Sequence, residues 1–159
     1  MAKGILSAGG NINLYRGCTH GCIYCDSRSR CYHIDHAFED VEVKQNAVEL
    51  LEEALRRRRA PCMVGTGSMT DPYLPLEAEL RLTRRAMEVV ERYGCGFTVI
   101  TKSDLILRDL DLLSRIQQNA KCVVQMTLTT ADETLCRKLE PNVCTTCLLY
   151  TSPSPRDVE

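Results

Sequence analysis

The chain has 159 residues, of which 44% are hydrophobic and 26% are charged, and its formal net charge is -1. This length suits one globular domain, and the near-neutral charge gives no electrostatic reason to expect a nucleic acid or a membrane surface as partner. No stretch approaches the ~20 apolar residues of a membrane helix, and the N-terminus lacks the pattern of a secretory signal. We therefore expect a cytoplasmic protein that does not contact a membrane.

Short apolar segments alternate with helical ones along the chain. Residues 4–15 are predicted to form a strand that leads into a loop ending near residue 36. Helical spacing of apolar residues predicts helices over 41–59, 76–93 and 105–116, and a further helix beginning near 130–132. Short apolar runs at 62–66, 97–101 and 122–128 predict strands. This alternation predicts an α/β fold with a parallel sheet, whose functional residues lie at the carboxyl ends of the strands.

The segment from Cys147 onward departs from this pattern, with alternating prolines and serines and no periodicity. We expect residues 1–143 to form the core and residues 144–159 to be a non-native or disordered tail. A fold that stops after four βα units leaves its last strand with an unpaired edge, which predicts that C-terminal units of the fold are missing.

Three of the ten cysteines, Cys18, Cys22 and Cys25, are clustered in the run CTHGCIYC. Three thiolates on one loop can bind three irons of a [4Fe-4S] cluster and leave the fourth iron without a protein ligand. That open iron can chelate the amino and carboxylate groups of S-adenosylmethionine (SAM), and electron transfer then cleaves SAM to a 5'-deoxyadenosyl radical. Tyr24, just before the third cysteine, is well placed to face a bound adenine.

Other interpretations remain open. The cysteines could form a zinc site, with a fourth ligand from His20, His33 or Cys31, in a zinc-stabilised binding module, although zinc motifs favour paired CxxC units. Tyr24 could also be a plain packing residue. The basic run at 56–59 could contact phosphates of a nucleic acid, but a solvated helix end is the favoured interpretation. The chain could also be an inactive fragment of an enzyme.

The run NLYRGCTHGCIYCDSR at 13–28 resembles the motif of the radical SAM superfamily, in the form used by proteins similar to spore photoproduct lyase. Later signatures of the same proteins are resembled by TDPY at 70–73, TKS at 101–103 with RD at 108–109, TLTT at 127–130 and LEP at 139–141. The resemblance covers about residues 4–143. It implies a radical SAM enzyme with a partial (βα)6 barrel, of which this chain holds the first four units.

By the same resemblance, Thr70 would hold the SAM amino group, Lys102 the SAM carboxylate and Thr127 the ribose hydroxyls. A lysine that faces a carboxylate is physically sensible, since each charge compensates the other, but Lys102 could also reach solvent from a strand end. The resemblance also implies an electron donor such as flavodoxin or ferredoxin, and it identifies no substrate or catalytic residue. Ser68 stands where the spore lyase has a hydrogen-donating cysteine, so repair of spore photoproduct is not expected.

Overall fold

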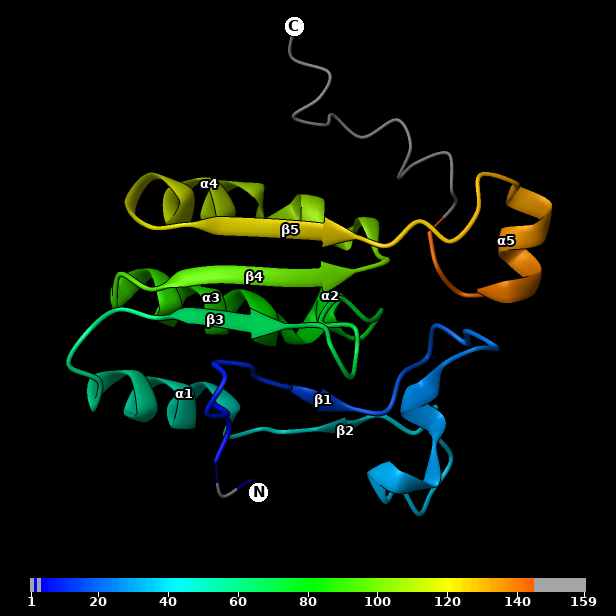
Figure 1. Ribbon diagram of the computed structural model, residues 1–159, viewed down its shortest axis with the longest axis horizontal. Helices are drawn as coiled ribbons and strands as arrows, with labels where there is room; N and C mark the ends of the chain where they lie inside the picture. The colour runs from blue at the N-terminus through cyan, green and yellow to red at the C-terminus, as the bar shows by residue number, and fades with distance from the viewer. Residues whose placement is uncertain (1, 3, 145–159) are drawn as a thin grey trace, which may run out of the picture.

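A computed structural model describes residue 2 and residues 4–144, and it shows an α/β fold around a parallel sheet (Figure 1). The sheet contains β3 (Met63–Thr66), β4 (Gly96–Thr101) and β5 (Cys122–Met126), in that order. Met63 lies opposite Gly96, and Phe97 lies opposite Cys122. The predicted parallel α/β sheet is confirmed, and within the described residues it does not close into a barrel.

The predicted first strand, 4–15, is largely irregular. Asn11 forms an isolated parallel bridge with Gly65 of β3, where the Ile12 amide donates a 2.7 Å hydrogen bond to the Gly65 carbonyl. Gly10 has a φ of 83°, a turn conformation that interrupts an extended strand. Regular pairing begins only at β1 (Tyr15–Arg16), which runs antiparallel to β2 (Glu42–Val43). The strand prediction was therefore wrong in extent, although residues 10–12 do lie along β3.

The three longer helices are α1 (Ala47–Arg56), α3 (Leu82–Arg92) and α4 (Leu110–Asn119). Helix α3 packs against both α1 and α4, and α3 and α4 pack against the sheet. The short helices are α2 (Glu77–Leu80) and α5 (Glu133–Leu139), with 3-10 turns η1 (Asp26–Arg28), η2 (Arg30–Tyr32) and η3 (Asp104–Asp109). Fully buried Phe97 and Val99 of β4 belong to the same apolar core as Leu112 of α4. No helix in the described part of the chain is long and apolar enough to cross a bilayer.

Three predicted helices needed correction. The helix expected over 41–59 begins at Ala47, because residues 42–43 pair with β1 instead. The helix expected over 76–93 breaks at Arg81, which has a φ of 49°. Glu77 stabilises this break, since its carboxylate accepts hydrogen bonds of 3.0 Å from the backbone amides of Leu82 and Thr83. The helix expected over 105–116 starts as the 3-10 turn η3 before it becomes α4.

The carboxyl ends of the three parallel strands all point toward the cysteine loop and α5 (Figure 1). This polarity follows from the parallel pairing, because every crossover returns the chain to the same end of the sheet. The loops after the strands and the cysteine loop are therefore brought to one edge. The predicted tail, 144–159, lies outside the described residues except for Cys144.

Candidate functional site

A cavity of about 180 Å³ lies at this carboxyl edge. Its walls come from four parts of the chain: the cysteine loop (Cys18, His20, Cys22, Cys25, Ser27), the loop after β3 (Gly67, Ser68, Met69, Asp71), the end of β4 (Ile100, Thr101, Lys102) and Thr127 after β5. The structure therefore brings together five of the seven residues predicted to bind the cluster or SAM, namely the three clustered cysteines, Lys102 and Thr127. Parallel strands make this convergence possible, since the contributing segments are far apart in the sequence.

The cysteine loop is held in place by its backbone. Gly17 has a φ of 91°, and a Cβ there would lie 2.5 Å from the Phe38 carbonyl oxygen, so glycine allows the chain to turn into the loop. The Cys18 amide donates a 2.8 Å hydrogen bond to the same carbonyl. Farther along, the Ile23 amide donates to the Leu139 carbonyl at 3.0 Å. The loop thus contacts both the segment before β2 and the end of α5.

Three thiols of this loop share one cavity. Cys22 is 9% exposed, while Cys18 and Cys25 are partly exposed, and all three are free thiols. Burial raises the pKa of Cys18 to about 11 and is also the main cause of the raised pKa of Cys22. Within residues 4–144, no three His, Cys, Asp or Glu side chains converge as a ready metal centre. The donor set nevertheless fits a cluster with three thiolate ligands, and binding it would release the thiol protons.

Asp71, in the cavity wall, connects the loop after β3 to the end of β4. Its carboxylate accepts hydrogen bonds from the Thr101 hydroxyl at 2.7 Å and from the Lys102 amide at 2.8 Å, and His20 Nε2 lies 3.0 Å from Asp71 Oδ2. Burial alone would raise the pKa of Asp71, but the contacts with His20, Lys102 and Thr101 outweigh burial and hold it below its usual value. Asp71 was not assigned a role from the sequence, although the TDPY run that contains it had been noted.

Two of the three residues considered as a fourth zinc ligand do not line the cavity with the three cysteines. Cys31 and His33 are exposed and do not line the cavity. His20 does line it, but its imidazole is buried against Asp71. Neither Cys31 nor His33 therefore provides the fourth ligand that a closed zinc site needs.

Lys102 points into a cluster of polar groups around buried Glu140. Lys102 Nζ donates to Glu140 Oε1 at 2.6 Å, and the hydroxyls of Tyr24 and Thr129 donate to the same oxygen. Burial raises the pKa of Glu140 and lowers that of Lys102, so burial disfavours the charge on each group. Their contact at 2.6 Å opposes this cost. Sequence analysis missed the role of Glu140, although the LEP run that contains it had been noted.

Two predicted residues lie outside the lining of this cavity. Tyr24 is 51% exposed, and its hydroxyl binds Glu140. Thr70 is 7% exposed and lines a neighbouring cavity, which shares Met69 with the first one. The two residues flank the site, from the cysteine loop and from the loop after β3.

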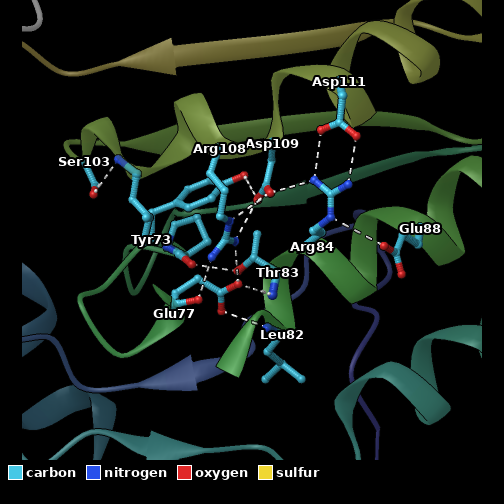
Figure 2. A network of polar contacts seen from close by, with 12 residues as sticks. Tyr73, Glu77, Leu82, Thr83, Arg84, Glu88, Ser103, Arg108, Asp109 and Asp111 are labelled. Carbon is cyan, nitrogen blue, oxygen red and sulfur yellow. Dashed lines mark hydrogen bonds and ion pairs between the residues drawn. The ribbon is translucent and has the colours of Figure 1, made fainter. Parts of the chain in front are cut away.

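A second polar network is centred on Asp109 and Glu77 (Figure 2). Asp109, which is fully buried, accepts hydrogen bonds from Tyr73 at 3.2 Å, from Arg84 at 2.9 Å and from Arg108 at 2.9 Å. Arg108 also donates to fully buried Glu77, at 3.2 Å. These contacts tie the loop after β3 to the segment after β4.

The same network reaches the strand that leads into the cysteine loop. The Tyr15 hydroxyl donates to Glu77 Oε2, and Tyr15 is 1% exposed. Burial, followed by the contact with Glu77, raises the pKa of Tyr15 far above its usual value, so the hydroxyl keeps its proton. Glu77 therefore positions β1 relative to α2 and α3. Its partner Tyr15 lies two residues before the turn at Gly17.

Comparison with known proteins shows one matching family. The profile of the Radical SAM superfamily matches residues 12–146. An uncharacterized protein of Methanocaldococcus jannaschii is 30% identical over 132 residues, which cover 82% of this chain and 48% of that protein. An uncharacterized protein of Mycobacterium tuberculosis is 33% identical over 137 residues, covering 81% of this chain and 40% of that protein.

An uncharacterized protein of Acidianus two-tailed virus is 28% identical over 147 residues, covering 86% of this chain and 47% of that protein. The chain thus spans about half the length, or less, of these curated relatives. No solved structure gives a significant match.

Proposed function

Because this chain belongs to the radical SAM superfamily, we propose that Cys18, Cys22 and Cys25 hold a [4Fe-4S] cluster that works with SAM. When bound, the cluster and SAM supply a 5'-deoxyadenosyl radical that abstracts hydrogen from a substrate. The observation that carries this proposal is the shared cavity, in which the three thiols of one loop meet Lys102 and Thr127 from two strand ends. Thiols suit a cluster, whereas an ammonium group and a hydroxyl suit the carboxylate and the ribose of SAM.

Lys102 is the proposed partner of the SAM carboxylate. It brings an ammonium group to the cavity wall, and its side chain is 16% exposed. Thr127 lines the same cavity and offers a hydroxyl for the ribose. We assign the adenine to the side of Tyr24 and the SAM amino group to the side of Thr70, which both lie at the margins of the cavity. The residues orient the cofactor, and the electron comes from a donor such as flavodoxin or ferredoxin.

We further propose that the core occupies residues 1–143 and that the subfamily is similar to spore photoproduct lyase. The supporting observations are the run at 13–28 and the motifs at 70–73, 101–103 and 127–130, each of which contributes residues to the lining of one cavity. Ser68 lines the cavity at the position of the lyase's hydrogen-donating cysteine. A serine hydroxyl is a far poorer hydrogen-atom donor than a thiol, so the substrate and the outcome are proposed to differ from those of the lyase.

The test is anaerobic reconstitution with iron and sulfide, followed by EPR spectra of the dithionite-reduced protein with and without SAM. We expect a [4Fe-4S]+ signal that shifts when SAM is added, and about four irons per chain. Cys25→Ser should abolish the signal. Cys31→Ser is the matched control, because Cys31 is exposed and does not line the cavity. Retention of stoichiometric zinc with no cluster, or an equal loss of cluster in both variants, would contradict the proposal.

A further inference from the structure

A second cavity, of about 140 Å³, adjoins the candidate cofactor site. Its walls are formed by residues 13 and 15–17 before the cysteine loop, by Tyr32, Ile34 and Lys44 after it, and by Met69 and Thr70. Met69 lines both cavities. Gly17 and Thr70 line the second cavity, whereas the next residues in the chain, Cys18 and Asp71, line the first. The two cavities are therefore immediate neighbours.

Two cations line this second cavity, and their charges are poorly compensated. Among the described residues, Arg16 has one carboxylate near it, Glu42, at 3.9 Å, and that carboxylate also lies 2.8 Å from His36. Lys44 donates a 2.7 Å hydrogen bond to the Asn13 carbonyl oxygen, and in the described part of the chain it forms no ion pair. Burial, and then the charge of Arg16, lower the pKa of Lys44. A bound anion would offset both the cost of burying the Lys44 charge and its repulsion by Arg16.

The cavity is also preorganised. The guanidinium of Arg16 donates hydrogen bonds to the carbonyl oxygens of Tyr32 at 2.9 Å and His33 at 2.7 Å, which fix its position. The side-chain oxygen of Asn13 is buried and has no hydrogen-bond partner among the described residues. Buried polar atoms are normally paired, so this oxygen lacks a donor that a ligand hydroxyl could supply.

We propose that this second cavity binds a phosphate group of the substrate. Two cations match the charge of a phosphate monoester better than that of a carboxylate, and a guanidinium fork fits phosphate oxygens. Asn13 Oδ1 then accepts a hydrogen bond from a hydroxyl elsewhere on the substrate. The anion site follows from the cavity itself, and its assignment to the substrate rests on the proposed function of the first cavity. The rest of the substrate then extends past Met69 toward the cofactor.

The test is titration calorimetry of inorganic phosphate into the full chain at constant ionic strength, with acetate as the comparison anion. We expect phosphate to bind at least tenfold more tightly than acetate. Lys44→Met should weaken phosphate binding at least tenfold, and Lys44→Arg should retain it. Lys121→Met is the matched control, because it removes the same charge from an exposed position outside the cavity. Equal binding of both anions, or an equal loss in both Met variants, overturns the proposal.

Asn13→Asp provides a second variant that keeps the size of the side chain. It adds a negative charge beside the two cations, so it should preserve the fold and still weaken phosphate binding at least tenfold. Unchanged phosphate binding in Asn13→Asp overturns the proposal. EPR after reconstitution separates this result from the proposed function. If phosphate binds but no cluster forms, the anion site stands and its assignment to a radical substrate fails; if a cluster forms but phosphate does not bind, the inference alone fails.

Discussion

Lys102 Nζ lies 2.6 Å from Glu140 Oε1, so the lysine proposed to bind the SAM carboxylate is already paired with a carboxylate of the chain. Glu140 is 3% exposed and receives further hydrogen bonds from Tyr24 and Thr129. An incoming carboxylate must therefore displace Glu140 from Lys102 or share the ammonium group with it. In either case the internal ion pair opposes cofactor binding.

Replacing Glu140 by Gln should tighten SAM binding. The amide keeps the shape of the side chain but removes the charge that competes for Lys102, and we expect a gain of about tenfold, or ~1.4 kcal/mol. The dissociation constant can be measured by titrating SAM into the reconstituted protein. Glu133→Gln, an exposed carboxylate of α5 paired with Arg137, is the control and should change little. Weaker binding in Glu140→Gln would show that this carboxylate assists the cofactor.

Lys102→Met should have the opposite effect on the cofactor and should also destabilise the fold. It removes the proposed partner of the SAM carboxylate, so SAM affinity should fall at least tenfold. It also leaves the buried charge of Glu140 uncompensated, which costs on the order of 3 kcal/mol of unfolding free energy. Urea denaturation should show that Lys102→Met with Glu140→Gln recovers stability, while SAM titration still shows weak binding. Recovery of both properties would rule out a direct role for Lys102 with SAM.

Alkylation with iodoacetamide should distinguish the cysteines by their environment. Cys31 is exposed and should react first, whereas Cys95 is 3% exposed and should react last. Cys18 should be slow even before reconstitution, because burial raises its pKa to about 11 and thereby lowers its thiolate fraction. After cluster assembly, mass spectrometry should find Cys18, Cys22 and Cys25 protected and Cys31 unchanged. Equal protection of Cys31 would show that the cluster uses other ligands.

Patterns of neighbouring residues in the sequence were enough to predict the cysteine loop and two strands of the sheet. The cysteine loop and the strands at 62–66 and 97–101 could be found because apolar runs and clustered cysteines are short-range signals. The break at Arg81 could not, because it depends on Glu77, whose carboxylate is held by Tyr15 and Arg108 from distant parts of the chain.

The candidate site shows the same division. Cysteine spacing identified one wall of the cavity, and the family resemblance added Lys102 and Thr127, which the structure places there. The pairing of Lys102 with Glu140 joins residues 38 positions apart, so no sequence periodicity could reveal it. The motif assigned Thr70 to the SAM amino group, but the cavity that Thr70 lines depends on how residues 67–73 fold.

The last prediction concerns Asp109 and the dependence of stability on pH. Burial alone would raise the pKa of Asp109, but hydrogen bonds from Arg108 and Arg84 outweigh burial and hold it below its usual value of 3.8. Because the folded-state pKa is depressed, the ionised carboxylate stabilises the fold above pH ~4, and this contribution disappears as the pH falls through the folded-state pKa. Asp109→Asn should lower the free energy of unfolding at pH 7 by about 3 kcal/mol, because it removes the buried charge that Arg84 and Arg108 share. Among the described residues, Arg108 then keeps only Glu77 as an acidic partner. Urea denaturation between pH 7 and pH 2 should show that the free energy of unfolding depends less steeply on pH in this variant than in the unmodified chain.

Asp104→Asn is the control, because Asp104 is exposed, and it should reproduce the pH profile of the unmodified chain. If the profile of Asp109→Asn stays equally steep in acid, the pH dependence belongs to other carboxylates.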